Sequence, residues 1–404
     1  MIYKDLFIND NIQQKHLNLG LAKKLSKRFN KIILEIREDL KNPTKTINVL
    51  DSKFKINFKM NDLSKFKKYK TVVIIGMGGS ILGAEAIFEF FKKKIKKKIY
   101  FFNDLNENKI KEFKKKKNSK TLFIIISKSG NTIETFTNTF LLNILKMNAK
   151  NLILISEKKN NLLFSLSKKL NLFYIEHKKN IGGRYSVLSE VGLLPAYLMG
   201  ININKLRLNI LDHLKKKHLN QLKKNTIKFA SMMNFRKINN LIFLNYFPEL
   251  EKFLFWCQQL IAESLGKKKR GFLPVISNVP KDHHSLMQLY LDGPKDKLFY
   301  IFSNDFKLSE IVQIDKRFGI TSYLNKKNFA LIKKAQKNAL IKTFIKKNIP
   351  FREFRIKKNN EQTLGKLFSL FILEVIIVGK MLNLNPFDQP AVEQVKVYTR
   401  KLLK

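Results

Sequence analysis

The chain has 404 residues, of which 44% are hydrophobic and 11% aromatic, a composition that excludes a disordered protein and allows two domains with separate cores. Its single cysteine, Cys257, excludes an intrachain disulfide and a cysteine-based metal cluster, and favours a reducing compartment. The formal net charge of +48 comes mostly from lysine, which is spread from end to end.

A charge of this size attracts polyanions, so nucleic-acid binding has to be considered. The chain is also rich in Asn, Ile and Phe, which share AT-rich codons with Lys, and it carries no nucleic-acid-binding motif. We therefore attribute the charge to genome composition and expect no specific nucleic-acid partner. The longest apolar stretch, 367–378, is interrupted by Glu374 and predicts a buried helix rather than a membrane span. With no signal-peptide pattern at the N-terminus, we expect a cytoplasmic protein without a membrane partner.

The first half of the chain changes pattern near Thr71. Residues 1–50 look helical and amphipathic, ending near Asn42–Pro43. From Thr71 onward, short apolar runs typical of buried strands alternate with helical stretches. The predicted strands are Val72–Ile75, Leu122–Ile126, Leu152–Ile155 and Leu172–Ile175, and the predicted helices lie at about 81–94, 132–147, 160–170 and 186–200. This alternation predicts a parallel sheet that is covered on both faces.

A second set of elements follows a Lys-rich helical region near 205–237. The predicted elements are strands at Leu241–Leu244 and Leu298–Phe302, a long helix at Pro248–Gly266 between them, a less clear strand–helix pair at Phe329–Leu331 and Ala339–Lys347, and a strong helix at Leu364–Leu382. The predicted class is α/β, with two doubly wound parallel-sheet domains. The predicted limits are 1–50 for an N-terminal helical segment, 51–203 and 204–384 for the two domains, and 385–404 for a C-terminal arm.

Ligands of doubly wound sheets bind beyond the carboxyl ends of the strands, so the loops after Ile75 and Ile126 are candidate sites. The first loop reads Gly76-Met77-Gly78-Gly79-Ser80. Its glycines let backbone N–H groups approach an anion, although it lacks the Gly-Lys-Ser/Thr ending of a P-loop. The second reads Ser127-Lys128-Ser129-Gly130-Asn131-Thr132, and its hydroxyls and lysine suit a phosphate monoester. Either loop could be an ordinary strand–helix turn, but two on one sheet favour phosphate binding.

Two charged residues are candidates for chemistry. Arg184 follows a glycine pair and opens a helix, where it could stabilise a developing oxyanion; the alternative is an exposed or ion-paired arginine. Glu263 lies near the C-terminal end of the helix Pro248–Gly266, where the helix dipole disfavours a carboxylate. A surface pair with Lys267 at i+4 is the simpler interpretation, and a general base is the functional one.

Two further segments carry polar side chains in defined positions. Asp282-His283-His284-Ser285 holds two of the six histidines, without a ligand set at metal-binding spacing. An acid–base histidine is favoured there over a capping or core histidine. The segment 385–390 contains two prolines, which fix the backbone and so direct Gln389 and Lys396, unless the segment is only a docked terminal helix. We expect no metal and no cofactor.

Six segments together resemble the glucose-6-phosphate isomerase (phosphoglucose isomerase) family. They are GMGGSILG, SKSGNTIET, GGRYSVLSEVGLLP, QQLIAESLGK, DHHSLMQLYLDGP and NPFDQPAVEQVK. They span about residues 70–400 in the family's order, and the short chain resembles the compact bacterial branch. The resemblance implies two sugar-isomerase (SIS) domains of doubly wound α/β type, a C-terminal arm and a homodimer with a shared active site.

The resemblance also assigns roles to residues. The substrate's phosphate would be held by Ser80, Ser127, Lys128, Ser129, Thr132 and Gln389, with Gly79 and Gly183 in the substrate-binding loops. Glu263 matches the family's base, which moves a proton between C1 and C2 of the sugar through a cis-enediol, and Arg184 matches the arginine that stabilises its charge. His284, supplied by the neighbouring subunit, would open the sugar ring with help from Lys396. These roles agree with what proton transfer next to a carbonyl requires.

The match has departures, and alternatives remain. Ser129 stands where many members have Thr, Leu265 replaces an Asn, and Ala391 stands where Gly is frequent; none of these removes a reacting group. Substrate strictness stays open, because related bifunctional enzymes also accept mannose 6-phosphate. A phosphosugar-sensing SIS protein is a non-enzymatic alternative, but it need not hold Glu263, His284 and Lys396. The first 70 residues are too few for the glutamine-hydrolysing domain of an amidotransferase.

Overall fold

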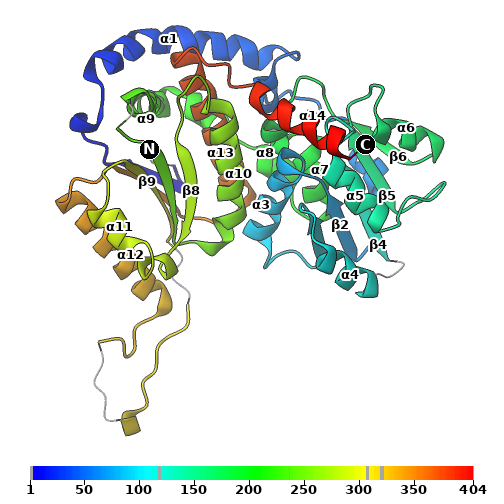
Figure 1. Cartoon of the computed structure of the whole chain (residues 1–404). Helices are drawn as coiled ribbons and strands as arrows, with labels where there is room; N and C mark the ends of the chain where they lie inside the picture. The colour runs from blue at the N-terminus through cyan, green and yellow to red at the C-terminus, as the bar shows by residue number, and fades with distance from the viewer. Residues whose placement is uncertain (1–2, 117–119, 236, 306–308, 319–322, 404) are drawn as a thin grey trace.

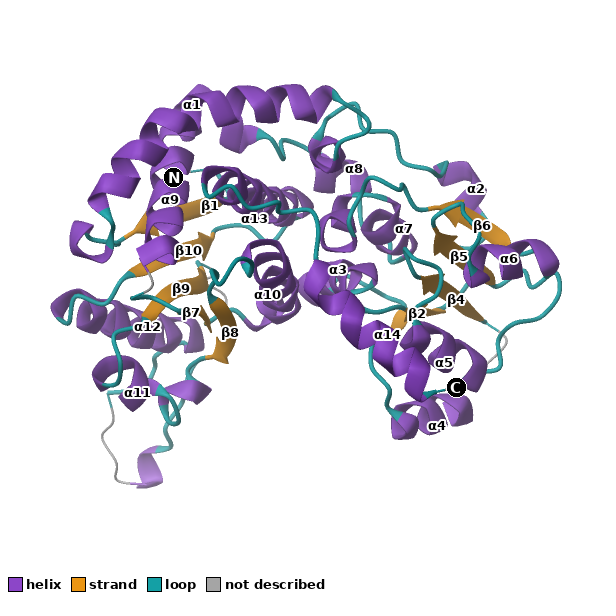
Figure 2. Cartoon of the chain, turned by 45° about the horizontal axis from the view of Figure 1, so that its top comes forward, coloured by secondary structure: helices purple, strands orange, loops and turns teal. Residues whose placement is uncertain are grey.

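The computed structural model describes residues 3–116, 120–235, 237–305, 309–318 and 323–403. Two α/β units lie side by side, each built on a five-stranded sheet (Figures 1 and 2). Between the two sheets lie α3 (Leu82–Phe91) and α10 (Glu251–Leu265), which pack against each other. The two doubly wound units confirm the predicted fold class.

The first sheet has the strand order β3-β2-β4-β5-β6, with every neighbouring pair parallel. Its strands are β2 (Thr71–Ile75), β3 (Lys98–Phe102), β4 (Thr121–Ile126), β5 (Leu152–Ser156) and β6 (Phe173–Glu176). Its further helices are α4 (Glu107–Lys116), α5 (Ile133–Leu141), α6 (Leu162–Lys169) and α7 (Glu190–Leu198), with α2 (Met60–Ser64) before β2. Four strands were predicted. The edge strand β3 was missed because only one of its five residues is buried.

The second sheet has the strand order β1-β10-β9-β7-β8. Its strands are β1 (Leu6–Asp10), β7 (Asn240–Asn245), β8 (Leu273–Asn278), β9 (Lys297–Asn304) and β10 (Phe351–Ile356). The remaining helices are α1 (Leu19–Lys41), α8 (Ile203–Arg207), α9 (Lys216–Phe235), α11 (Met287–Asp292), α12 (Phe329–Lys346), α13 (Glu361–Met381) and α14 (Glu393–Leu402). The strands are parallel except β1, which pairs antiparallel with β10 and closes one edge.

Two local predictions were wrong. Residues 6–10 form a strand rather than a helix, because Leu6 and Ile8 point into the core while the backbone pairs with β10. Phe329–Leu331 begins α12 instead of forming a strand, and Asn328 caps that helix by accepting the N–H of Leu331 at 2.7 Å. Because β1 joins the second sheet and α1 packs on α9 and α13, we propose that the segment from β1 to the end of α1 belongs with the second unit.

Buried ion pairs join α13 to β10 and to Asp5, which directly precedes β1. Arg352, which is 1% exposed, donates to Glu374 of α13 at 2.5 Å and to the Tyr300 hydroxyl at 2.8 Å. Lys366 of α13 lies 3.2 Å from Asp5. The predicted buried helix is thus confirmed, with its charged residues paired. Within the described ranges, none of the helices combines the length and apolar character needed to span a bilayer.

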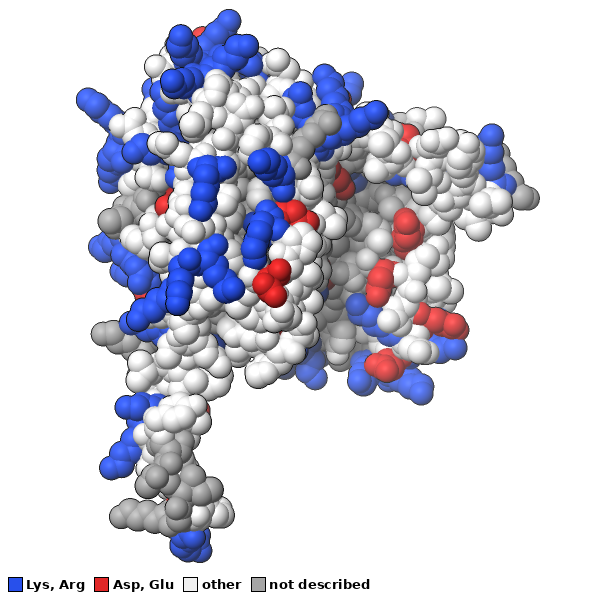
Figure 3. All heavy atoms as spheres, turned by 60° about the vertical axis from the view of Figure 1, so that its left-hand side comes forward, with Lys and Arg blue, Asp and Glu red and all other residues white. Residues whose placement is uncertain are grey.

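The surface charge is scattered. Figure 3 shows basic side chains spread over one face of the molecule, with a few acidic ones among them, rather than gathered into a single band.

Replacing Glu374 by Leu is expected to lower the free energy of unfolding by about 3–5 kcal/mol, because the guanidinium of Arg352 would stay buried without its partner. Urea denaturation followed by circular dichroism measures this loss. The matched control is Glu38→Leu on the exposed face of α1, which should change the stability by less than about 0.5 kcal/mol. Equal effects of the two substitutions would contradict a structural role for the pair.

Candidate active site

The two predicted phosphate loops lie beside each other at the carboxyl edge of the first sheet. Strands β2 and β4 are neighbours, and Ile75 pairs with Ile125, so the strands end together. The chain leaves β2 through α3 toward β3 and leaves β4 through α5 toward β5, in opposite directions along the sheet. Such a topological switch point is where open α/β sheets bind ligands. Ser80 ends the short 3-10 helix η3 (Gly78–Ser80) there and is buried.

Three hydroxyl groups of the second loop form one cluster at the N-terminus of α5. The Ser127 Oγ lies 2.8 Å from the Thr132 Oγ1, and the Ser129 Oγ lies 3.4 Å from the same atom. Hydroxyls donate to phosphate oxygens, and the helix dipole adds partial positive charge. Lys128 extends instead toward Glu157, 3.5 Å away, and donates to the carbonyl of Lys179 at 2.9 Å. Burial of this side chain lowers the pKa of its ammonium group.

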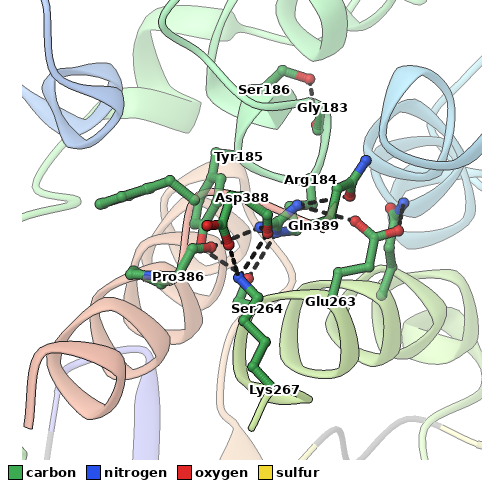
Figure 4. A network of polar contacts seen from close by, with 12 residues as sticks. Gly183, Arg184, Tyr185, Ser186, Glu263, Ser264, Lys267, Pro386, Asp388 and Gln389 are labelled. Atoms are coloured by element: carbon green, nitrogen blue, oxygen red, sulfur yellow. Dashed lines mark hydrogen bonds and ion pairs between the residues drawn. The ribbon is translucent and has the colours of Figure 1, made fainter. Parts of the chain in front are cut away.

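Arg184 forms the centre of the site (Figure 4). Its side chain is 3% exposed, and it lies on the short 3-10 helix η4 (Gly183–Leu188). The Nε donates to Ser264 at 2.7 Å, and one terminal nitrogen donates to Glu263 at 3.1 Å and to Gln389 at 3.0 Å. The other terminal nitrogen donates to the carbonyls of Pro386 and Asp388 at 2.7 and 2.9 Å. All five N–H groups of the guanidinium are therefore engaged.

Glu263 is held on both carboxylate oxygens yet remains accessible. One oxygen accepts from Arg184, and the other accepts from the Gln259 amide at 2.9 Å. Its side chain is 29% exposed. The predicted surface pair with Lys267 is wrong, because Lys267 follows the end of α10 and contacts Asp388 at 2.5 Å instead. A positioned, solvent-accessible carboxylate beside a fixed cation has the geometry of a general base.

Close backbone contact joins the first loop to Arg184. A Cβ on Gly79 would lie 2.2 Å from the carbonyl carbon of Gly183 and 2.4 Å from the nitrogen of Arg184. Gly78 has a φ of +52°, and a Cβ there would lie 2.8 Å from the Gln259 amide nitrogen. Only glycine allows these approaches, so Gly78 and Gly79 set the spacing between the first phosphate loop and the Arg184–Glu263 pair.

The C-terminal segment 385–389 closes the site from the other side. Gln389 contacts Arg184, and no described contact links it to the hydroxyl cluster that would hold a phosphate. Lys267 anchors the segment through Asp388 and the carbonyl of Asn385, and its hydrogen bond to Asp388 is the main cause of that carboxyl's lowered pKa. The Tyr185 hydroxyl adds a bond to the carbonyl of Pro386 at 2.8 Å.

His284 and Lys396 lie away from this group. The end of β8 lies beside the start of α10, because Asn278 of β8 donates to Glu251 of α10 at 2.6 Å. His284 follows β8 within a few residues, whereas Glu263 lies 12 residues further along α10, roughly 18 Å at the rise of an α-helix. Lys396 lies on α14, an exposed helix, and pairs with Glu393 at 2.7 Å. Neither residue meets Glu263 within the described part of one chain.

Sequence reasoning missed three side chains of this network: Gln259, Ser264 and Tyr185. Gln259 had a usable signal, because it lies at i−4 from Glu263 and therefore on the same face of α10. Ser264 and Tyr185 gave none, since they meet only when α10 packs on η4. Among the described residues, no three His, Cys, Asp or Glu side chains gather in a way that could hold a metal ion.

The fold and the loops define a doubly wound α/β protein with a candidate phosphate site at the switch point of its first sheet. The structure superposes on a hypothetical protein from Thermus thermophilus with a TM-score of 0.81, at 24% identity over 98% of this chain and 100% of that one. It also superposes on a glucose-6-phosphate isomerase from Chlamydia trachomatis with a TM-score of 0.69, at 18% identity over 84% and 71% of the two chains. At these identities the likeness concerns the fold alone.

The sequence comparisons define the family. The family model for phosphoglucose isomerase matches residues 45–273. The glucose-6-phosphate isomerase of Methanocaldococcus jannaschii is 31% identical over 85% of this chain and 87% of its own length. That of Campylobacter jejuni is 30% identical over 83% and 86%. The chain belongs to the phosphoglucose isomerase family.

Gly79→Ala is expected to destabilise the protein by roughly 1–3 kcal/mol and to reduce turnover, because the added methyl group pushes the first loop away from Gly183 and Arg184. Thermal denaturation and initial rates measure the two effects. Gly20→Ala is the matched control, since a Cβ there meets only the Asn18 side-chain oxygen at 3.6 Å. If both variants behave as the unmodified protein, the backbone contact does not set the spacing of the site.

Proposed function

We propose that this protein interconverts glucose 6-phosphate and fructose 6-phosphate by proton transfer. The observation that carries the proposal is the solvent-accessible Glu263 carboxylate, fixed by Gln259 and Arg184 next to two phosphate-type loops. Membership of the phosphoglucose isomerase family supports the same reaction. The positions of these side chains support an enzyme rather than a phosphosugar sensor, because a sensor needs the loops but not a positioned base.

In the proposed reaction, the phosphate binds to the hydroxyls of Ser127, Ser129 and Thr132 at the start of α5, with Ser80 on the neighbouring loop. Lys128 adds positive charge from the same loop. This anchoring places the open-chain sugar beside α10, where its reacting carbons meet Glu263. Binding energy from a remote, non-reacting phosphate orients the substrate for the proton transfer.

Glu263 takes the proton from C2 of the open-chain aldose, and the electrons move onto O1 to give a cis-enediolate. A proton passes from O2 to O1, and Glu263 returns its proton to C1, so no atom is gained or lost. Arg184 stabilises the negative charge. Because its five N–H groups are already engaged, the oxyanion has to replace one of its present acceptors, and Gln389 and Glu263 share one terminal nitrogen.

We further propose that the protein acts as a homodimer in which His284 of one chain serves the site of the other. Within one chain His284 lies at the opposite end of α10 from Glu263, so only a second copy can bring them together. The exposed helix α14 supports such an arrangement, because Val395, Tyr398 and Leu402 on it are 67%, 54% and 87% exposed. A partner chain that covers α14 would also give Lys396 a defined position.

The cellular setting follows from the same proposal. We expect the enzyme in the cytoplasm, where the lone buried thiol of Cys257 stays reduced. We expect no nucleic-acid partner, since the basic side chains on the face in Figure 3 are scattered.

Glu263→Gln is expected to lower the turnover of fructose 6-phosphate by roughly 10²–10⁴-fold or more, because the amide cannot accept the proton from carbon. The amide oxygen can still accept from Arg184, and the Gln259 amide can turn its unpartnered oxygen toward the new NH2 group, so sugar-phosphate binding should change little. A coupled assay for glucose 6-phosphate, run in EDTA, measures the rate, and calorimetry measures the binding. Turnover equal to that of the unmodified protein would remove Glu263 as the base.

A mixing experiment tests the shared site. His284→Ala and Glu263→Gln should each be nearly inactive as pure dimers. After the two variants are mixed and allowed to exchange chains, half of the dimers contain one of each, and each mixed dimer has one complete site. Activity should therefore rise to about a quarter of that of the unmodified enzyme. No recovery, with chain exchange shown by mass spectrometry, would place His284 and Glu263 in the same chain's site or remove the histidine's role.

A further inference from the structure

The second sheet has a cavity of its own at its carboxyl edge. It measures about 1100 Å³ and lies where β7 and β9 end. Its walls include Tyr246 and Glu249 after β7, Ser303 near the end of β9, and the N-terminal half of α12. Lys93, which follows α3 in the first unit, also lines it. The cavity is separate from the Arg184–Glu263 site, since none of that site's residues lines it.

This cavity occupies the position in the second unit that the phosphate loops occupy in the first. In the order β3-β2-β4-β5, the adjacent strands β2 and β4 send their helices in opposite directions. In the order β8-β7-β9-β10, the adjacent strands β7 and β9 do the same through α10 and α12. Each unit therefore has one topological switch point, and in open α/β sheets ligands bind at that point.

The wall of the cavity carries buried polar groups, and one of them has no hydrogen-bond partner among the described residues. Ser303 is 4% exposed, and its hydroxyl has no hydrogen-bond partner among the described residues. Lys337, which is 5% exposed, forms a buried ion pair with Glu353. Buried hydroxyls are normally hydrogen-bonded, so an unpartnered one at a cavity wall indicates a missing partner.

The charges that line the cavity favour an anion. Glu89 and Glu249 are paired with Lys92 and Lys93 at 3.3 and 3.1 Å, and Asp305 lies 3.6 Å from Arg355. Among the remaining groups, Lys333 and Lys334 of α12 have no ion pair within 4 Å in the described part of the chain. Burial lowers the pKa of Lys333, and the Glu249 carboxylate, which is already paired with Lys93, opposes this shift only in part. Glu310 is the one lining carboxylate here without a described ion pair, so the balance is positive.

We propose that this cavity is a second ligand site, which binds a small phosphorylated anion through Lys333, Lys334 and the Ser303 hydroxyl. The first turn of α12 also lines the cavity, and the helix dipole favours negative charge there. The site does not depend on the proposed isomerase reaction, because it shares no residue with it.

The site is connected to the catalytic one by two helices. Helix α3 begins just after Ser80 and ends just before the Lys92–Lys93 pair, whereas α10 begins just after Glu249 and carries Glu263 near its other end. The helices pack against each other, and the Lys93–Glu249 ion pair joins them at the cavity. The cavity thus borders the far ends of both helices that lead to the catalytic site.

Lysine labelling with inorganic phosphate as the probe tests the proposal. Amine acetylation is followed residue by residue by mass spectrometry, with and without phosphate, at constant ionic strength set with chloride. Phosphate at a concentration near its dissociation constant should slow the labelling of Lys333 and Lys334 about twofold. The exposed pair Lys23 and Lys24 on α1 should not respond. The protection should survive in Ser129→Ala/Thr132→Ala, which disables the catalytic loop, and should weaken in Ser303→Val.

Equal responses of the two lysine pairs, or loss of the protection in Ser129→Ala/Thr132→Ala, would overturn the proposal. Equilibrium dialysis with radiolabelled phosphate provides an independent test, because it measures the number of phosphate ions bound per chain. Lys333→Ala/Lys334→Ala should bind one phosphate fewer per chain than the unmodified protein, whereas the control Lys23→Ala/Lys24→Ala should not. A normal count in the first variant would also refute the site. Neither measurement uses turnover, so failure here is distinguishable from failure of the isomerase proposal.

Discussion

The guanidinium of Arg184 is the interaction on which the catalytic site depends. It is almost fully buried, and its five donors hold Glu263 and Ser264 of α10, together with Gln389 and two carbonyls of the segment 386–388. Three parts of the chain that are distant in sequence are thereby fixed around one charge. A buried cation is costly unless every donor is satisfied, so loss of any of these acceptors disturbs the others. In the proposed reaction the same charge stabilises the enediolate, because it is already oriented when that intermediate forms.

The arrangement of helices explains how one chain builds this site. Helices α3 and α10 lie side by side between the sheets and run from the catalytic loops to the carboxyl edge of the second sheet. The two sheets share the same connectivity around their switch points, but only the first has a hydroxyl-rich loop. The hydroxyl cluster therefore lies at one switch point, while the other has a cavity with a different set of polar groups.

Much of the fold could be predicted from sequence because its central strands, such as β2, β4 and β9, are apolar runs bounded by polar residues. Edge strands and strands with charged residues could not be predicted in this way. Strand β10 contains Arg352 and Glu353, and the burial of these two residues depends on their partners in α13 and α12. In the site, the family resemblance named Glu263 and Arg184, but local spacing favoured a Glu263–Lys267 pair. The actual partner of Glu263 is Arg184, 79 residues away in the sequence. The spacing of residues along one helix predicts only neighbours three or four positions apart, so it cannot predict this contact. In the proposed homodimer, the placement of His284 and Lys396 depends on a second chain, which no single-chain pattern specifies.

The central claim, proton transfer by Glu263 through an enediol, is tested most directly by running the isomerisation in ²H₂O and following deuterium by NMR. A carboxylate that carries the proton exchanges it with solvent during the lifetime of the intermediate. The account predicts solvent-derived deuterium at C2 of glucose 6-phosphate formed from fructose 6-phosphate by the unmodified protein, and none with Glu263→Gln. Isomerisation without any deuterium in the product, or unchanged incorporation by the variant, would contradict it.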